Sequence, residues 1–161
     1  MAIRRVHDMG WRAAHYVPSG TSSVSGVIIP AGPERAVGVV SSTYLKDANG
    51  PAWAGDAGVE EYRRFMARHL PNADAGDFYY LYGYTVSQAL RRVLEQCGGD
   101  FRRERIMREA ANLRDLEIPT LLPGVRVNTS PTDYRPLRLL QLIRWDGRTW
   151  RRFGPLIDGV A

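Results

Sequence analysis

Apolar and polar positions recur along this chain with two different periods, and the longer one, about 3.6 residues, predicts four helices. A short amphipathic pattern covers residues 2–9, and longer patterns cover residues 59–70, 78–97 and 100–113. Asp100 can accept backbone N–H groups and is the expected N-cap of the last helix. The side chains expected to face a core are Val59, Tyr62, Phe65, Met66 and Leu70, then Leu81, Val86, Leu90, Val93 and Leu94, then Ile106, Met107, Ala110 and Ala111.

The shorter period, two residues, predicts strands near both ends of the sequence. Residues 13–17 combine small, aromatic and β-branched side chains, and residues 37–44 are rich in β-branched side chains. Residues 125–128 alternate valine with polar residues. Residues 139–145 are largely apolar on both faces, which predicts a strand covered on both sides. The Asp146-Gly147 pair favours a two-residue type I′ turn, after which the chain should return as a second strand. This order of elements predicts an α/β fold with a C-terminal β-hairpin.

Composition narrows the class of protein to an ordinary globular domain. The chain has 161 residues, of which 44% are hydrophobic and 24% charged. No apolar run approaches the ~18 residues that a membrane span needs, and the lone Cys97 excludes an intrachain disulfide. The net charge of +5 comes almost wholly from arginines scattered along the chain, with Lys46 as the single lysine. Scattered charge is typical of a solvated surface rather than of a nucleic-acid interface.

Motifs for catalysis and metal binding are missing from the sequence. His7, His15 and His69 lie far apart and lack the spacing of a metal site. The sequence also contains no GxSxG elbow and no glycine-rich phosphate loop. We therefore expect a protein that is not an enzyme and that needs no metal or cofactor.

Two segments carry candidate ligand-binding residues. The loop after the strand predicted at residues 13–17 is rich in hydroxyls and free N–H groups, and ligands of open α/β sheets bind beyond the carboxyl ends of strands. A solvated connector is the alternative interpretation. The helix predicted from Phe78 begins with a cluster of tyrosines, which can cover an apolar ligand and orient a polar group. The candidates are Ser19, Gly20, Thr21 and Ser22 in the loop, Tyr82 and Tyr84 in the helix, and Tyr44 at the end of a strand.

Three stretches resemble a known family in the same order along the chain. They are residues 32–47, with GPE and GVVSSTYLKD, residues 82–88, YGYTVSQ, and residues 122–147, with LPG, DY, QL and DG. All three are similar to the C-terminal part of the substrate-binding proteins of branched-chain amino acid ABC transporters. The resemblance covers nearly the whole chain and begins inside a helix that, in the family, follows a large N-terminal portion.

The resemblance implies part of a two-lobed type I periplasmic binding protein fold. Residues 1–45 and 130–161 would form α/β segments of the second lobe, and residues 46–129 a mainly helical segment of the first. It also implies a receptor that captures a small organic ligand by lobe closure and presents it to a membrane permease. The implied location is the periplasm. Because the first ten residues have no apolar export signal, the protein would be cytoplasmic if the chain is the complete natural product.

Ser19 is where the sequence departs from the amino-acid-binding pattern of the family. Leucine-binding members place a carboxylate at this strand end to hold the ammonium group of the ligand. A serine cannot neutralise a cation, and burying an unpaired ammonium costs several kcal/mol. The expected ligand is therefore either a branched-chain amino acid or an aromatic carboxylate.

Other interpretations of the sequence remain open. The residues after Leu139 could form a basic, aromatic hairpin that binds single-stranded nucleic acid, although we do not favour a nucleic-acid partner. The chain could also be an associating α/β domain that binds no ligand. Apolar faces on the strands at residues 37–44 and 139–145 predict self-association or a companion chain that supplies the missing lobe. The hairpin residues concerned are Arg144, Trp145, Arg148, Trp150, Arg151 and Arg152.

Overall fold

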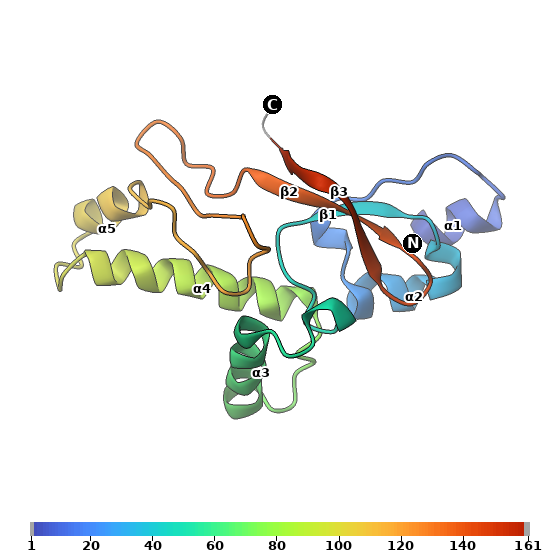
Figure 1. The fold of residues 1–161 in the computed structure, drawn as a ribbon, viewed down its shortest axis with the longest axis horizontal. Coiled ribbons are helices and arrows are strands. Elements are labelled where there is room, and N and C mark those ends of the chain that lie inside the picture. The colour runs from blue at the N-terminus through green and yellow to red at the C-terminus, as the bar shows by residue number, and fades with distance from the viewer. Residues whose placement is uncertain (1, 160–161) are drawn as a thin grey trace.

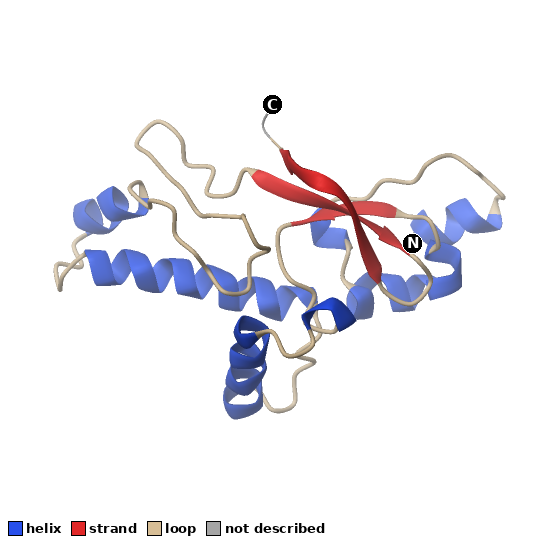
Figure 2. Ribbon diagram, viewed as in Figure 1, coloured by secondary structure: helices blue, strands red, loops and turns tan. Residues whose placement is uncertain are grey.

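A computed structural model describes residues 2–159 of the protein, whose strands and longer helices lie close to the segments that the periodicity predicts. Figure 1 shows an elongated molecule with α4 and α5 at one end and with α1, α2 and the sheet toward the other. Figure 2 shows that long loops connect these two parts. The helices are α1 (Ala2–Asp8), α2 (Ile29–Ala31), α3 (Ala57–His69), α4 (Phe78–Gln96) and α5 (Arg103–Ala110), and the strands are β1 (Val40–Thr43), β2 (Leu139–Trp145) and β3 (Trp150–Asp158).

The sheet is antiparallel, with β2 between β1 and β3. The strand expected at residues 13–17 is reduced to one parallel bridge, in which the Val17 N–H donates to the Val40 carbonyl at 2.9 Å. This prediction was wrong in extent for two reasons. The Ser41 hydroxyl, rather than a backbone group, donates to the Val17 carbonyl at 2.9 Å, and Ser19 already enters a 3₁₀ turn. The valine alternation at residues 125–128 likewise yields one bridge, Leu116 with Val127.

The hairpin between β2 and β3 is confirmed, but its turn differs from the expected type. Trp145 pairs with Trp150, which leaves four residues in the loop instead of two. The Asp146 carboxylate accepts the backbone N–H groups of Arg148 and Thr149, both at 2.8 Å. Gly147 has φ 101°, whereas Asp146 lacks the positive φ that a type I′ turn also requires at its first central residue. The side-chain bonds of Asp146 therefore favour the longer loop.

Helix α3 buries the stripe that the sequence predicts, in part. Val59, Tyr62 and Met66 are at most 2% exposed, whereas Phe65 and Leu70 lie at the rim and are 40% and 43% exposed. The helix begins close against another segment, because a Cβ on Gly58 would lie 2.5 Å from the Pro119 carbonyl oxygen. Glycine at this position allows the backbones to approach.

Helix α4 buries less of its apolar surface than the sequence predicts. Leu81 and Val93 are buried, but Val86, Leu90 and Leu94 are 47%, 53% and 36% exposed. The prediction was wrong for these three because the rest of the chain within residues 2–159 packs against only one side of the helix. An apolar groove between α4 and α5 results.

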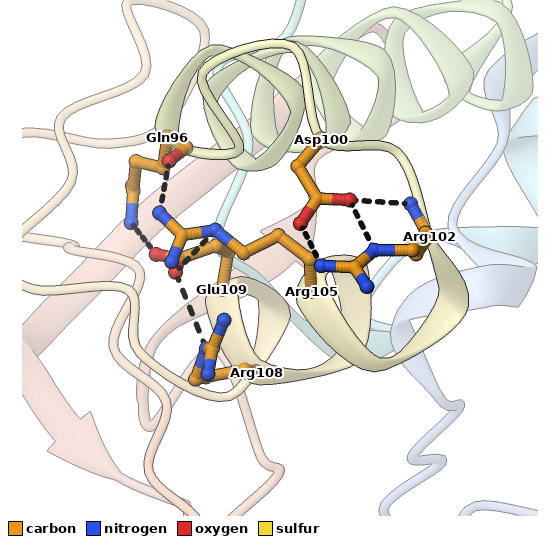
Figure 3. Close-up of polar contacts among 6 residues, drawn as sticks. All are labelled: Gln96, Asp100, Arg102, Arg105, Arg108 and Glu109. Carbon is orange, nitrogen blue, oxygen red and sulfur yellow. Dashed lines mark hydrogen bonds and ion pairs between the residues drawn. The ribbon is translucent and has the colours of Figure 1, made fainter.

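The connection from α4 to α5 is held by charged side chains, as Figure 3 shows. The expected N-cap role of Asp100 was wrong, since Arg102 flanks the helix and no side chain caps it. Asp100 instead accepts bonds from the Arg102 N–H and guanidinium, which lower the pKa of its carboxyl. Glu109 is 8% exposed and accepts a bond from the Gln96 amide at 3.2 Å, while Arg105 donates to the Gln96 carbonyl. These bonds tie α5 to the end of α4.

The buried apolar side chains form two clusters, one on each side of the crossing from β1 into residues 45–48. The smaller cluster packs α1 and residues 28–39 around Trp145. The Trp145 indole N–H donates to the Pro33 carbonyl at 2.9 Å, which satisfies the one polar group of this 2% exposed side chain. The larger cluster lies between residues 45 and 127 and includes the buried faces of α3 and α4. The junction between the two clusters contains a cavity.

Candidate functional site

The cavity at this junction has a volume of about 280 Å³. Its wall combines buried members of the larger cluster, such as Leu45 and Leu81, with Val24 and Trp150, which pack against the smaller cluster. Apolar side chains make up most of that wall, which suits a small solute with an apolar body. The polar groups come from the loop after the first extended segment, from the crossing after β1 and from β3. The lining residues are Ser22, Ser23, Val24, Thr43, Leu45, Lys46, Asp47, Ala48, Gly50, Pro51, Ala52, Trp53, Gly76, Phe78, Leu81, Ile143, Thr149, Trp150, Arg151 and Arg152.

Lys46 and Asp56 form an ion pair beside the cavity. The Lys46 ammonium, whose residue is 9% exposed, donates to both Asp56 carboxylate oxygens at 2.9 and 2.8 Å. Asp56 is also the N-cap of α3, because Oδ1 accepts the Val59 N–H at 3.1 Å. Burial by itself would raise the pKa of Asp56, but the bonds from Lys46 and the backbone lower it overall. The charge of the single lysine is therefore neutralised within the protein.

Two tryptophans position the side of the cavity formed by β3. The Arg152 guanidinium carbon lies 4.6 Å from the centre of the Trp53 ring, within cation–π distance. Trp150 packs edge-on against Trp145 at 5.6 Å, and its indole N–H donates to the Ser22 carbonyl at 2.8 Å. The contacts of Arg152 with Trp53 and of Trp150 with Ser22 thus hold β3 against N-terminal segments of the chain at the cavity wall.

The loop that contains Ser19, Gly20, Thr21 and Ser22 lies beside the cavity and uses its hydroxyls locally. Residues Ser19–Thr21 form a 3₁₀ turn. The Thr21 hydroxyl donates to the Pro18 carbonyl at 2.8 Å, and the Ser22 hydroxyl donates to the Ser19 carbonyl at 2.7 Å. Among these four candidates, Ser22 lines the cavity.

Tyr79 connects this loop to α4, a contact that the sequence reasoning missed. Its hydroxyl donates to the Gly20 carbonyl at 2.7 Å, across 59 positions of sequence. The available signal was the tyrosine cluster at the start of α4, but helical position alone did not distinguish Tyr79 from its neighbours. The contact places the predicted loop and the predicted tyrosine-rich helix start side by side.

The three tyrosines favoured by sequence lie outside the cavity wall. Tyr82 is 44% exposed and stacks on Phe78, with ring centres 6.3 Å apart. Tyr84 packs between Tyr62 and Phe65, and burial together with Glu61 raises the pKa of its hydroxyl. Tyr44 is half-buried against the larger cluster, where burial and then Tyr82 raise its pKa. Their assignment as ligand contacts stays a prediction.

The charged residues of the cavity were also missed by the sequence reasoning. Lys46 and Asp47 lie within a stretch that carries the family resemblance, whereas Arg152 is more than a hundred positions away. Burial raises the pKa of the Asp47 carboxyl, although backbone N–H groups of Asn49 and Gly50 oppose the shift. No local pattern joins these positions, so only the fold brings them together.

The hairpin tryptophans, the potential metal ligands and the helices of residues 2–159 bear on nucleic-acid, metal and membrane binding. Trp145 is 2% exposed and Trp150 is half-buried, so neither ring is free to stack on a nucleic-acid base. No group of three His, Cys, Asp or Glu side chains within residues 2–159 could hold a metal ion. None of the helices in that range is long and apolar enough to cross a membrane.

Comparison with protein-family models and with curated proteins finds no match, whereas comparison of the fold with solved structures does. A branched-chain amino acid ABC transporter protein from Thermus thermophilus, solved with bound valine, matches with a TM-score of 0.78 and 13% sequence identity. A possible leucine/isoleucine/valine-binding protein from Rhodopirellula baltica matches with a TM-score of 0.75 and 18% identity. A substrate-binding periplasmic protein from Ralstonia solanacearum matches with a TM-score of 0.74 and 16% identity.

These matches are extensive for this chain and partial for the solved structures. They cover 99%, 94% and 97% of this chain but 43%, 38% and 41% of the respective solved chains. The chain therefore spans less than half the length of the proteins it matches. Identities this low show the fold alone, and that fold is the one the resemblance implied, part of a type I periplasmic binding protein.

Proposed function

We propose that the protein is a solute-binding component of an ABC transporter, or a part of one, and that it holds a small organic ligand at the junction of its two clusters. The observation that carries this proposal is the junction cavity, whose wall combines residues of the larger cluster with residues that pack against the smaller one. The Tyr79 to Gly20 hydrogen bond supports it, since it joins helix α4 to the predicted ligand loop. Binding at such a junction couples the ligand to the relative position of the two parts.

The remaining parts of the proposal follow from the same fold. Residues 1–45 and 130–161 would form the second-lobe portion, and residues 46–129 the first-lobe portion. The membership of the two clusters supports this division. A membrane permease would be the partner and the periplasm the location, with no covalent chemistry performed on the ligand. Calorimetric titration of the purified protein with leucine, valine and benzoate would test the proposal. The absence of a binding signal for all three compounds would contradict it.

Ser19→Glu is expected to shift ligand preference toward amino acids. Ser19 itself does not line the cavity, but its carbonyl accepts the hydroxyl of Ser22, which does, so a longer side chain at position 19 starts next to the cavity wall. The parent should bind benzoate at least as tightly as leucine, because position 19 has no carboxylate to hold an ammonium group. A glutamate there would repel an anion and could pair with an ammonium, so the ratio of the two affinities should change by about tenfold or more. Isothermal titration calorimetry with both ligands measures this ratio.

Ser19→Gln is the matched control, since it has the length of glutamate without the charge. It should leave the preference close to that of the parent. Tight leucine binding by the parent that Ser19→Glu does not alter would show that the ammonium group is held elsewhere.

The apolar groove between α4 and α5 is expected to make the chain self-associate. The strands that first suggested association are largely covered, because Val39, Val40 and Ile143 are buried. The groove instead exposes Leu90 and Met107, each 53% accessible. A second copy or a companion chain could cover this surface. Light scattering over a range of concentrations should show species larger than a monomer.

Leu90→Asp should shift the distribution toward monomer, since a carboxylate in an apolar contact is costly to bury. Ser87→Asp places the same charge at an exposed position of α4 outside the groove and should have little effect. A monomeric parent at every concentration would contradict the prediction.

A further inference from the structure

We infer that Arg152 is the carboxylate anchor of the junction cavity, so that the cavity selects small solutes that combine a carboxylate with an apolar body. This inference rests on the proposed solute-binding function and adds the chemical class of the ligand and the residue that recognises it. It is carried by the distribution of charge around the cavity and by the geometry of one cation–π contact.

Arg152 is the cation of the cavity wall whose charge is not already paired. The Lys46 ammonium is held by both oxygens of Asp56. Arg151 is held by Asp146, with Nε 2.6 Å from Oδ2. Arg152 makes a contact with Trp53 but forms no ion pair with any residue of the described range 2–159. An anionic ligand would therefore find one available guanidinium.

The contact with Trp53 leaves that guanidinium ready for a carboxylate. A guanidinium is planar, and a stack on an aromatic ring uses its face while its N–H donors point outward in the plane. Those donors match the two oxygens of a carboxylate in a bidentate pair. The 4.6 Å separation between the Arg152 carbon and the Trp53 ring centre fits such a stack. Trp53 thus orients Arg152 without consuming its hydrogen bonds.

The surroundings of Arg152 supply the apolar part of the site. Its strand partner in the register is Ile143, which also lines the cavity. Phe78 and Leu81 from α4 and Trp150 from β3 complete the apolar wall. The Asp47 carboxylate lies on the same wall, but the Asn49 N–H donates to it at 2.9 Å within its own turn. A cavity of about 280 Å³ suits a solute of the size of benzoate or smaller.

Benzoate and benzamide provide the test, since they share size and shape and differ in charge. Isothermal titration calorimetry should show that the parent binds benzoate at least tenfold more tightly than benzamide. Arg152→Gln should weaken benzoate binding by tenfold or more, because charge-assisted bonds are the strong ones, and should leave benzamide nearly unchanged. Arg152→Lys retains the charge but not the planar donors, so its benzoate affinity should lie between those of the parent and Arg152→Gln.

Arg144→Gln is the matched control. Arg144 is also an exposed arginine of the hairpin that lies over an aromatic ring, with its guanidinium carbon 4.8 Å from the Phe153 ring centre, but it does not line the cavity. The Arg144→Gln variant should leave the affinities for benzoate and for benzamide unchanged. If the parent binds both compounds equally, or if Arg152→Gln binds benzoate like the parent, the role of Arg152 is refuted while solute binding stands. If benzoate, leucine and valine all fail to bind the parent, the proposed function itself is refuted.

Discussion

Trp145→Ala is expected to destabilise the protein by about 4 kcal/mol, the usual cost of emptying a large aromatic site in a core. Trp145 is 2% exposed, joins the smaller hydrophobic cluster and packs against Trp150 with ring centres 5.6 Å apart. Its loss leaves a cavity and removes the donor to the Pro33 carbonyl. Urea denaturation followed by circular dichroism measures the change in the free energy of unfolding.

Two further variants separate the causes of this effect. Trp145→Phe keeps an aromatic ring but removes the indole N–H, so it should recover a large part of the lost stability. Trp11→Ala removes a tryptophan that is 64% exposed and should change stability by about 0.5 kcal/mol or less. Equal effects of Trp145→Ala and Trp11→Ala would contradict the buried packing of Trp145.

Asp56→Ala is expected to destabilise the protein by about 2 kcal/mol or more, because it removes two interactions at once. The first is the N-cap of α3, worth about 1 kcal/mol. The second is the partner of Lys46, a residue that is 9% exposed and whose ammonium would lose its counter-charge. Asp56→Asn retains a good capping residue but not the charge, so it should recover only the part of the lost stability that comes from the N-cap. Urea denaturation of the three proteins at neutral pH measures both parts.

The ion pair also predicts how the difference between the parent and Asp56→Asn depends on pH. The pKa of Asp56 is lowered in the folded protein, so the ionised carboxylate stabilises the fold. This contribution is fully present above the ordinary aspartate pKa of about 3.9 and is lost as pH falls from there through the lower folded-state pKa. The stability difference should therefore be constant near neutrality and shrink below about pH 4. A difference that stays constant down to pH 2 would contradict the role of the Lys46 pair.

The helices were largely predictable because their signals are local. A stripe with a 3.6-residue period located α3 and α4, and Asp56 and Asp77 provide the side-chain caps at their starts. The exposure of Val86, Leu90 and Leu94 was not predictable, since periodicity shows that a face is apolar but not that another segment covers it. The hairpin was predictable for the same local reason. Its turn was not, because the Asp146 carboxylate competes with the backbone for the N–H groups of the loop.

The candidate site was predictable only where it lies on continuous segments. The hydroxyl-rich loop and the tyrosine-rich start of α4 were identified from the sequence, and the structure brings them together through Tyr79 and Gly20. The junction cavity was not identified. Its wall joins residues that are distant in the sequence: Trp53 lies 31 positions after Ser22, and Arg152 lies 99 positions after Trp53.

The amino-acid sequence by itself determined the fold class, the helical and strand segments and the resemblance to a solute-binding protein. These properties depend on residue type and spacing over short distances, which a linear chain displays directly. The tertiary structure alone decided which apolar faces are covered and which charges remain available. Lys46 and Arg152 are both cations in the sequence, and in the fold both lie over the Trp53 ring, but only Lys46 also has a carboxylate partner, Asp56. The strength and availability of a charge depend on neighbours in space, and those neighbours come from distant parts of the chain.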